Sequence, residues 1–230
     1  MTNKGFAVAI DGPVGVGKST TARRVAETLG MTYIDTGAMY RAVALFCTEK
    51  KIDLHNATAV ESVLSDIDIH LRIANGVQRV YLRDGDKRRD ISDDIRTQSI
   101  SEGASVVAAY KAVREKLVSQ QKQLAATGRV VMDGRDIGSH VLPWAQAKIY
   151  LDASTETRAK RRVLDLEAKG LPADFEKVRE ETIIRDERDK NRTNSPLIRT
   201  PDAHYIDTGN MSCEEVVETI VNIAKLKEGR

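Results

Sequence analysis

The chain has 230 residues, 41% of them hydrophobic and 30% charged, which is typical of a globular protein with a normal core. Its 36 basic and 34 acidic residues leave a net charge of +2, which excludes a global field that attracts nucleic acid or an anionic membrane. Two distant cysteines, and no apolar run long enough for a signal peptide or a membrane span, indicate a cytoplasmic protein. We expect a monomer with no nucleic-acid or membrane partner.

Strand and helix alternate along most of the chain. The apolar run "FAVAI" at 6–10 precedes glycines, as expected of a buried parallel strand, and a helical pattern follows it and stops near Gly30. Similar runs predict four more buried strands at 32–35, 129–133, 147–152 and 203–207. This order predicts an α/β fold with a five-stranded parallel sheet and helices on both faces.

One region departs from the alternation. Residues 51–101 contain a short helix and then alternating segments, with Asn75-Gly76 and Asp84-Gly85 as hairpin turns. We therefore predict one domain, whose core comprises 1–50 and 102–230 and whose insert at 51–101 is a small antiparallel β subdomain.

The strand at 6–10 leads into "GPVGVGKST", which matches the phosphate-loop pattern G-x-x-x-x-G-K-S/T and opens a helix. Backbone N–H groups of such a loop surround phosphates, the lysine reaches the outer phosphates, and the hydroxyl that follows binds Mg²⁺. We therefore expect ATP or GTP with Mg²⁺ as cofactor. The predicted nucleotide-binding residues are Gly12, Pro13, Val14, Gly15, Val16, Gly17, Lys18, Ser19 and Thr20.

The first of two "YIDTG" segments follows, at 33–37. The sequence has neither the N-K-x-D nor the D-x-x-G string of a GTPase, which leaves a small kinase with a second, arginine-rich phosphate site. After this copy, Thr36, Tyr40 and Arg41 come at the end of a strand and in the next helical turn, where they suit a phosphate monoester. The alternative is a helix cap with a solvated arginine.

The segment "VVMDGRDIGS" at 130–139 ends another strand in charged residues. Asp133 has the position of a carboxylate that holds Mg²⁺ through water. Arg135 could bind an acceptor phosphate, and Asp136 could accept a hydrogen bond from an amino group. The alternative is a surface turn with an internal Arg–Asp pair.

Two basic helices are predicted next. "IIRDERDKNR" places Arg185, Asp189 and Arg192 on one helix face, although a solvated charge run remains the alternative. The preceding helix is basic as well, and "KGLPAD" joins the two, so we predict a lid near 158–192 that closes over phosphates. Its basic residues are Arg158, Lys160, Arg161 and Arg162.

The second "YIDTG", at 205–209, lacks a following arginine. Ser212 and Glu215 form a capping box there, and the helix after it has a buried apolar face. We interpret this copy as a strand end followed by a helix start, and its identity with the first copy as coincidence.

Together these motifs, with "ASVVAAYKAVR" at 104–114, resemble the bacterial cytidylate kinases, which transfer phosphate from ATP to CMP or dCMP. The resemblance extends from the phosphate loop to the C-terminal helix and implies that Ser105, Arg114 and Asp136 bind cytosine. It also implies a ribose site at Arg185 and Asp189. The implied acceptor-phosphate residues are Tyr40, Arg41, Arg135 and Arg192, and those implied for ATP include Arg158 and Arg162.

Ser105 and Arg114 are nine residues apart, which would put them on opposite sides of an unbroken helix, so we predict a break between them. The acceptor oxygen of a nucleoside monophosphate is already anionic and needs no general base, so we assign catalysis to positioning and charge neutralisation. The predicted catalytic residues are Lys18, Arg135, Arg185 and Arg192, with Ser19 and Asp133 on Mg²⁺.

We expect CMP to be preferred over UMP, because each hydrogen bond lost to uracil costs roughly 1 to 3 kcal/mol. Two alternatives remain open. One is another phosphate-loop kinase, for example one directed to UMP or to a different small molecule. The other is a non-enzymatic module whose binding depends on nucleotide.

Overall fold

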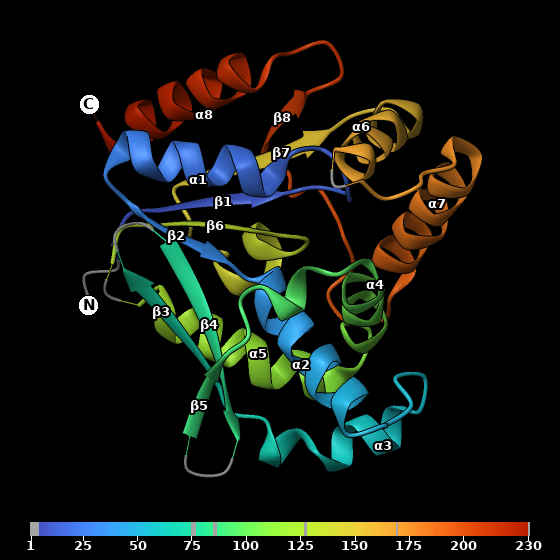
Figure 1. The fold of residues 1–230 in the computed structure, drawn as a ribbon. Coiled ribbons are helices and arrows are strands. Elements are labelled where there is room, and N and C mark those ends of the chain that lie inside the picture. Colours follow the sequence, from blue (N-terminus) through green and yellow to red (C-terminus); the bar gives the residue numbers. More distant parts are fainter. Residues whose placement is uncertain (1–4, 75–76, 85–86, 127, 169, 230) are drawn as a thin grey trace.

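The computed structural model describes residues 5–74, 77–84, 87–126, 128–168 and 170–229. A sheet of five parallel strands lies at its centre, in the order β2-β6-β1-β7-β8 (Figure 1). Because every pairing is parallel, all five strands end at the same edge of the sheet. The predicted five-stranded parallel sheet is confirmed. Its strands are β1 (Ala7–Asp11), β2 (Thr32–Asp35), β6 (Val130–Gly134), β7 (Ala147–Asp152) and β8 (His204–Asp207).

Helices cover both faces of the sheet, as the alternation predicted. In β1, Val8 and Ile10 pack in the same cluster as residues of α1 (Lys18–Leu29) and α8 (Cys213–Glu228). The intervening Ala7 and Ala9 belong to the opposite cluster, which includes residues of the short helix η3 (Ile137–Val141). A strand buried on both faces needs apolar residues at every position, which accounts for the continuous apolar run.

Strand β8, one of the two edge strands, differs from the prediction of five buried strands. Three of the four residues of β8 are exposed, and Tyr205 retains 46% of its accessible surface. This strand lies at one edge of the sheet and pairs only with β7, so one of its sides has no neighbouring strand. The capping box of Ser212 and Glu215 that follows β8 is confirmed at the start of α8.

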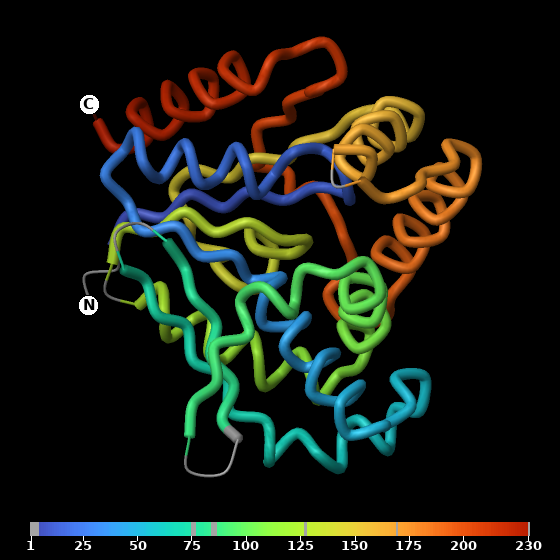
Figure 2. Tube along the Cα trace, in the orientation of Figure 1, coloured from blue at the N-terminus to red at the C-terminus, as the bar shows by residue number. Residues whose placement is uncertain are grey.

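The insert contains a separate antiparallel sheet of three strands, β3 (Ile69–Ala74), β4 (Val77–Asp84) and β5 (Lys87–Asp90). The predicted turn residues Asn75, Gly76 and Gly85 lie outside the described residues. Two short helices, α3 (Ala57–Ser62) and η1 (Leu64–Asp66), precede the strands, and η2 (Asp94–Arg96) follows them. Val80 and Leu82 share one apolar cluster with α2 (Gly37–Glu49), which attaches the insert beside the β2 edge of the core sheet (Figure 2).

The helix break predicted between Ser105 and Arg114 is confirmed. Helix α4 (Gln98–Val107) ends before Ala108, and α5 (Lys111–Leu124) starts after Tyr110, whose backbone is extended. Further along the chain, α6 (Thr155–Glu167) and α7 (Phe175–Asn191) lie side by side over a small apolar cluster of their own (Figure 1). None of the described helices combines the length and apolar composition that a membrane crossing requires.

Candidate active site

The phosphate loop connects β1 to α1, as predicted. Gly15 and Gly17 adopt positive φ angles of 80° and 86°, which side chains disfavour, and the loop thereby curves back on itself before α1 begins. The Lys18 amine donates to the carbonyl oxygen of Pro13 at 2.5 Å, so it lies folded onto its own loop. Burial lowers the pKa of Lys18 well below its ordinary value, and the nearby Arg135 lowers it further. An anion in this loop would stabilise the charged amine.

Beside the loop, Asp133 at the end of β6 is held from two sides. Its Oδ2 accepts a hydrogen bond from the Ser19 hydroxyl at 2.9 Å, and its Oδ1 accepts one from the Tyr33 hydroxyl at 2.8 Å. The pair of Ser19 and Asp133 supplies only oxygen ligands, which fits Mg²⁺ completed by phosphates and waters. Tyr33 was not predicted as a site residue, because in the sequence it reads as an apolar strand position.

A second buried carboxylate fixes the loop after β6. Both oxygens of Asp11 accept backbone hydrogen bonds, from Ile137 and Gly138, each at 2.7 Å. Burial raises the pKa of Asp11 to about 7. These bonds tie the end of β1 to the loop that carries Arg135 and Asp136, so Asp11 orients both side chains indirectly. Asp11 was not predicted as a site residue, although it precedes the phosphate-loop pattern by one position.

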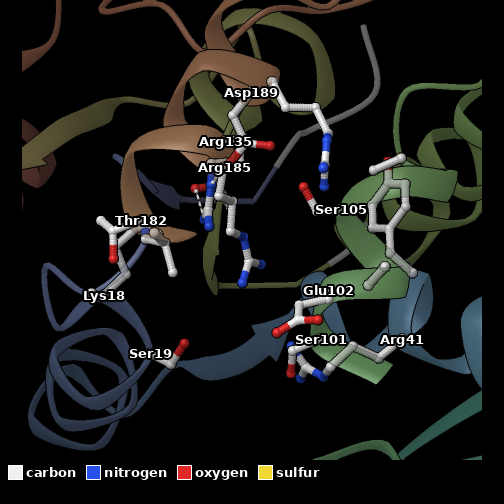
Figure 3. Close-up of a pocket in the computed structure, with 18 of the residues that line it drawn as sticks. Lys18, Ser19, Arg41, Ser101, Glu102, Ser105, Arg135, Thr182, Arg185 and Asp189 are labelled. Carbon is white, nitrogen blue, oxygen red and sulfur yellow. Dashed lines mark hydrogen bonds and ion pairs between the residues drawn. The ribbon is translucent and has the colours of Figure 1, made fainter. Parts of the chain in front are cut away.

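Two arginines and a carboxylate occupy the centre of the site (Figure 3). The Nε of Arg135 donates to Asp189 Oδ2 at 2.7 Å. Burial, together with the charge of Arg135, lowers the pKa of Arg185 to about 10. Burial alone would raise the pKa of Asp189, but Arg135 and Arg185 outweigh it, and the net pKa is lowered. Two guanidinium groups close to one carboxylate leave an excess positive charge suited to an anion.

The expected cytosine end brings together Asp136, Arg114 and Ser105. Asp136 forms a buried ion pair with Arg114, and Arg192 Nη2 lies 3.4 Å from the other carboxylate oxygen. The hydroxyl of Ser105 is buried and has no hydrogen-bond partner among the described residues. An unpaired buried hydroxyl is costly without a ligand, so this end of the site is suited to a polar molecule.

Three contacts or backbone positions in the structure differ from those that the sequence suggested for Arg135, Arg192 and Thr36. The internal Arg135–Asp136 pair does not form, because Arg135 bonds Asp189 and Asp136 bonds Arg114. Arg192 does not continue the helical face, since α7 ends at Asn191 and the backbone of Arg192 is extended. The Thr36 hydroxyl does not cap α2 but donates to the Asp133 carbonyl at 2.7 Å.

Arg41 is not a solvated arginine. Its Nη2 lies 2.7 Å from Asp35 Oδ2, and the Arg41 side chain is only 22% exposed. Arg158 and Arg162, both on α6, line the cleft described next. Arg158 also bonds the carbonyls of Ala153 and Val14 and lies 2.6 Å from the Asp186 carboxylate.

One cleft of about 1340 Å³ unites these groups. It exceeds the range of about 300 to 1,000 Å³ common for a single small-molecule site, which leaves room for two ligands. Every predicted site residue except Gly12 and Pro13 lines it. Lys18 and Ser19 lie on one side of it and Ser105 and Arg41 on the other, with the central arginines between them (Figure 3). Ser101, Glu102 and Thr182 also line the cleft and were not predicted.

A phosphate loop at the end of the central parallel strand, facing an arginine-lined anion site in the same cleft, defines a phosphate-loop kinase. Comparisons with known proteins give the family. The model of the family described as cytidylate kinase matches residues 8–226. The cytidylate kinase of Shouchella clausii is 45% identical over 222 residues, covering 96% of this chain and 97% of the relative. That of Geobacillus kaustophilus is 47% identical over 224 residues, covering 97% and 98%. The chain therefore belongs to the cytidylate kinase family.

Among solved structures, an uncharacterized protein from Eubacterium ventriosum has a TM-score of 0.53 at 12% identity, covering 99% of this chain and 100% of that one. At this identity the likeness concerns the fold alone. It agrees with the parallel sheet and flanking helices described above.

Proposed function

We propose that this protein transfers the γ-phosphate of ATP to CMP or dCMP, giving ADP and CDP or dCDP, in pyrimidine nucleotide metabolism. One observation carries the proposal: a single cleft has a phosphate loop at one side, a buried hydroxyl and carboxylate suited to a base at the other, and buried arginines between them. Membership of the cytidylate kinase family supports the same acceptor.

On the donor side, the phosphate loop binds the ATP phosphates, and Lys18 exchanges its bond to Pro13 for the outer phosphates. Ser19 and Asp133 hold Mg²⁺, with Asp133 already oriented by Tyr33. When bound, the metal ion neutralises charge that develops on the transferred phosphoryl group. Arg162 contributes to the same side from the lid.

On the acceptor side, Ser105 and Asp136 accept hydrogen bonds from the cytosine amino group, and Arg114 donates to the ring. Arg185 and Asp189 hold the ribose. The acceptor phosphate lies among side chains drawn from three segments of the chain, namely Tyr40, Arg41, Arg135 and Arg192. Thr36 supports this group through its bond to the Asp133 carbonyl.

Transfer needs no protein base, because the attacking phosphate oxygen is already ionised. The catalytic contribution of Lys18, Arg135, Arg185 and Arg192 is to bring two anions into line and to neutralise the charge between them. A lid formed by residues near 158–192 excludes water that would otherwise hydrolyse ATP. All these groups belong to one chain, so a monomer suffices, and we place it in the cytoplasm, where both nucleotides occur.

The test is an acceptor panel. Purified protein with Mg²⁺ and ATP should phosphorylate CMP and dCMP. It should use UMP at least about tenfold less efficiently, because uracil lacks the amino group and its hydrogen bonds. The reaction should stop when EDTA removes the metal ion. Preferred use of UMP or of an unrelated acceptor would favour another phosphate-loop kinase. Absence of transfer to every monophosphate would favour a nucleotide-dependent binding module.

A further inference from the structure

One side-chain amide of the insert forms hydrogen bonds with the edge of the core sheet. Gln78, on β4, accepts a hydrogen bond from the backbone N–H of Asp35 at 2.9 Å and donates one to the carbonyl of the same residue at 3.2 Å. Strand β2, which ends at Asp35, is an edge of the core sheet. The amide of Gln78 therefore takes the place that a peptide group of a neighbouring strand would occupy.

Asp35 in turn holds a residue of the active site. Its Oδ2 lies 2.7 Å from Nη2 of Arg41, and its Oδ1 accepts the backbone N–H of Ala38 at 3.1 Å. The carboxylate thus fixes both the first turn of α2 and the guanidinium that α2 carries. Arg41 lines the acceptor side of the cleft, and Gln78 lies outside it.

Other contacts between the insert and the core involve α2 rather than Asp35. Val80 and Leu82 pack on α2, and Arg89 pairs with Glu49 at the far end of that helix at 2.7 Å. A second cavity, of about 320 Å³, adjoins Gln78, Asp35 and Arg41. The cavity borders Asp35 on this side, and among the described residues the hydrogen bonds that join Asp35 to the insert are the two made by Gln78.

We propose that Gln78 is a positioning residue for the acceptor phosphate: it fixes Asp35, whose carboxylate orients the Arg41 guanidinium toward the cleft. The inference rests on the proposed function, in which Arg41 contacts that phosphate. It gives the insert a defined role in catalysis, because movement of β4 relative to β2 changes the position of a charged group in the site.

The variant to test is Gln78→Met, which preserves length and volume but removes both hydrogen bonds. Its matched control is Gln146→Met, because Gln146 Oε1 also accepts a backbone N–H of the core sheet, that of Ala7, at 2.9 Å. Ala7 begins β1, at the opposite end from the phosphate loop. We expect Gln78→Met to raise the KM for CMP about 3- to 10-fold at saturating ATP, with the KM for ATP unchanged. Gln146→Met should change neither.

A double variant identifies the route. If Gln78 acts through Arg41, then adding Gln78→Met to Arg41→Met should change the KM for CMP less than twofold, because the two changes remove one interaction. The inference would be overturned if the effects of Gln78→Met and Arg41→Met on the KM for CMP multiplied in the double variant, or if Gln78→Met and Gln146→Met had equal kinetics. The proposed function would stand in either case. Failure of the unaltered protein to phosphorylate CMP would instead refute the proposed function. Thermal unfolding of each variant separates loss of folding from loss of positioning.

Discussion

Replacement of Asp136 by Ala is the most direct test of the proposal that Asp136 binds the cytosine of the acceptor nucleotide. Asp136 is buried, with 5% of its surface accessible, and it pairs with Arg114 while lying 3.4 Å from Arg192. In the proposed function its removal deletes a charged acceptor for the cytosine amino group, an interaction worth about 1.5 to 3 kcal/mol. At about 1.4 kcal/mol per tenfold change, kcat/KM for CMP should fall about 10- to 150-fold.

The same change has a cost to folding that must be separated from the cost to binding. Without Asp136, two buried guanidinium groups lose their carboxylate, and breaking a buried ion pair in this way costs about 3 to 5 kcal/mol. A domain of this size loses roughly 2 to 4 °C of melting temperature per kcal/mol. Kinetics should therefore be measured well below the melting temperature of the variant, at about 15 °C.

A coupled assay of ADP formation at varied CMP and saturating ATP gives kcat and KM for CMP. The same assay at varied ATP and saturating CMP gives the KM for ATP. The KM for ATP should stay within about twofold, because Asp136 lies at the cytosine side of the cleft. Asp207→Ala is the matched control, since Asp207 ends β8 at the sheet edge that Asp136 follows, but it is exposed and outside the cleft. Equal losses for ATP and CMP, or no loss for CMP, would refute the assignment of Asp136 to the base.

Three further predictions follow from buried polar groups. Tyr33→Phe removes a hydrogen bond that orients Asp133, so half-maximal activity should need about 10-fold more Mg²⁺; an unchanged Mg²⁺ titration would contradict this. Asp11 has a pKa of about 7 in the folded protein, above the value of about 3.9 in an unfolded chain. Between these two pH values the folded state keeps a proton that the unfolded state has lost. The free energy of unfolding should therefore fall by up to about 4 kcal/mol as pH rises from 4 to 7. Urea unfolding should show that dependence reduced in Asp11→Asn. Arg185→Met should lower kcat at least about 100-fold. It should nevertheless raise the melting temperature, because burial lowers the pKa of Arg185 and so disfavours its charged form. A lower melting temperature would contradict the predicted gain in stability.

Much of the fold could be predicted because it depends on local pattern. The five strands follow from short apolar runs, and the break before α5 follows from helical geometry once the family resemblance implies that Ser105 and Arg114 bind the same base. The exposure of β8 could not be predicted, because its apolar residues resemble those of the buried strands. Which strand lies at an edge is decided by the order β2-β6-β1-β7-β8, a property of long-range pairing.

The candidate site could be predicted as a set of charged residues but not as a set of contacts. The two "YIDTG" copies illustrate the limit. Tyr33 of the first copy is buried and donates to Asp133, whereas Tyr205 of the second is 46% exposed and stacks on Tyr150. Identical letters acquire different roles because their neighbours in space come from distant segments. For the same reason no local signal marks Gln78, which reaches Asp35 across 43 positions of sequence.

Arg158 joins three segments of the chain beside the cleft. Its guanidinium bonds the Val14 carbonyl of the phosphate loop at 3.1 Å, the Ala153 carbonyl at 3.0 Å and the Asp186 carboxylate of α7 at 2.6 Å. Moving the first turn of α6 away from the loop would break these hydrogen bonds to a buried charged group, which is costly. The bonds therefore couple the first turn of α6, the phosphate loop and α7 to one another, and we expect the three to shift together when a ligand enters the cleft.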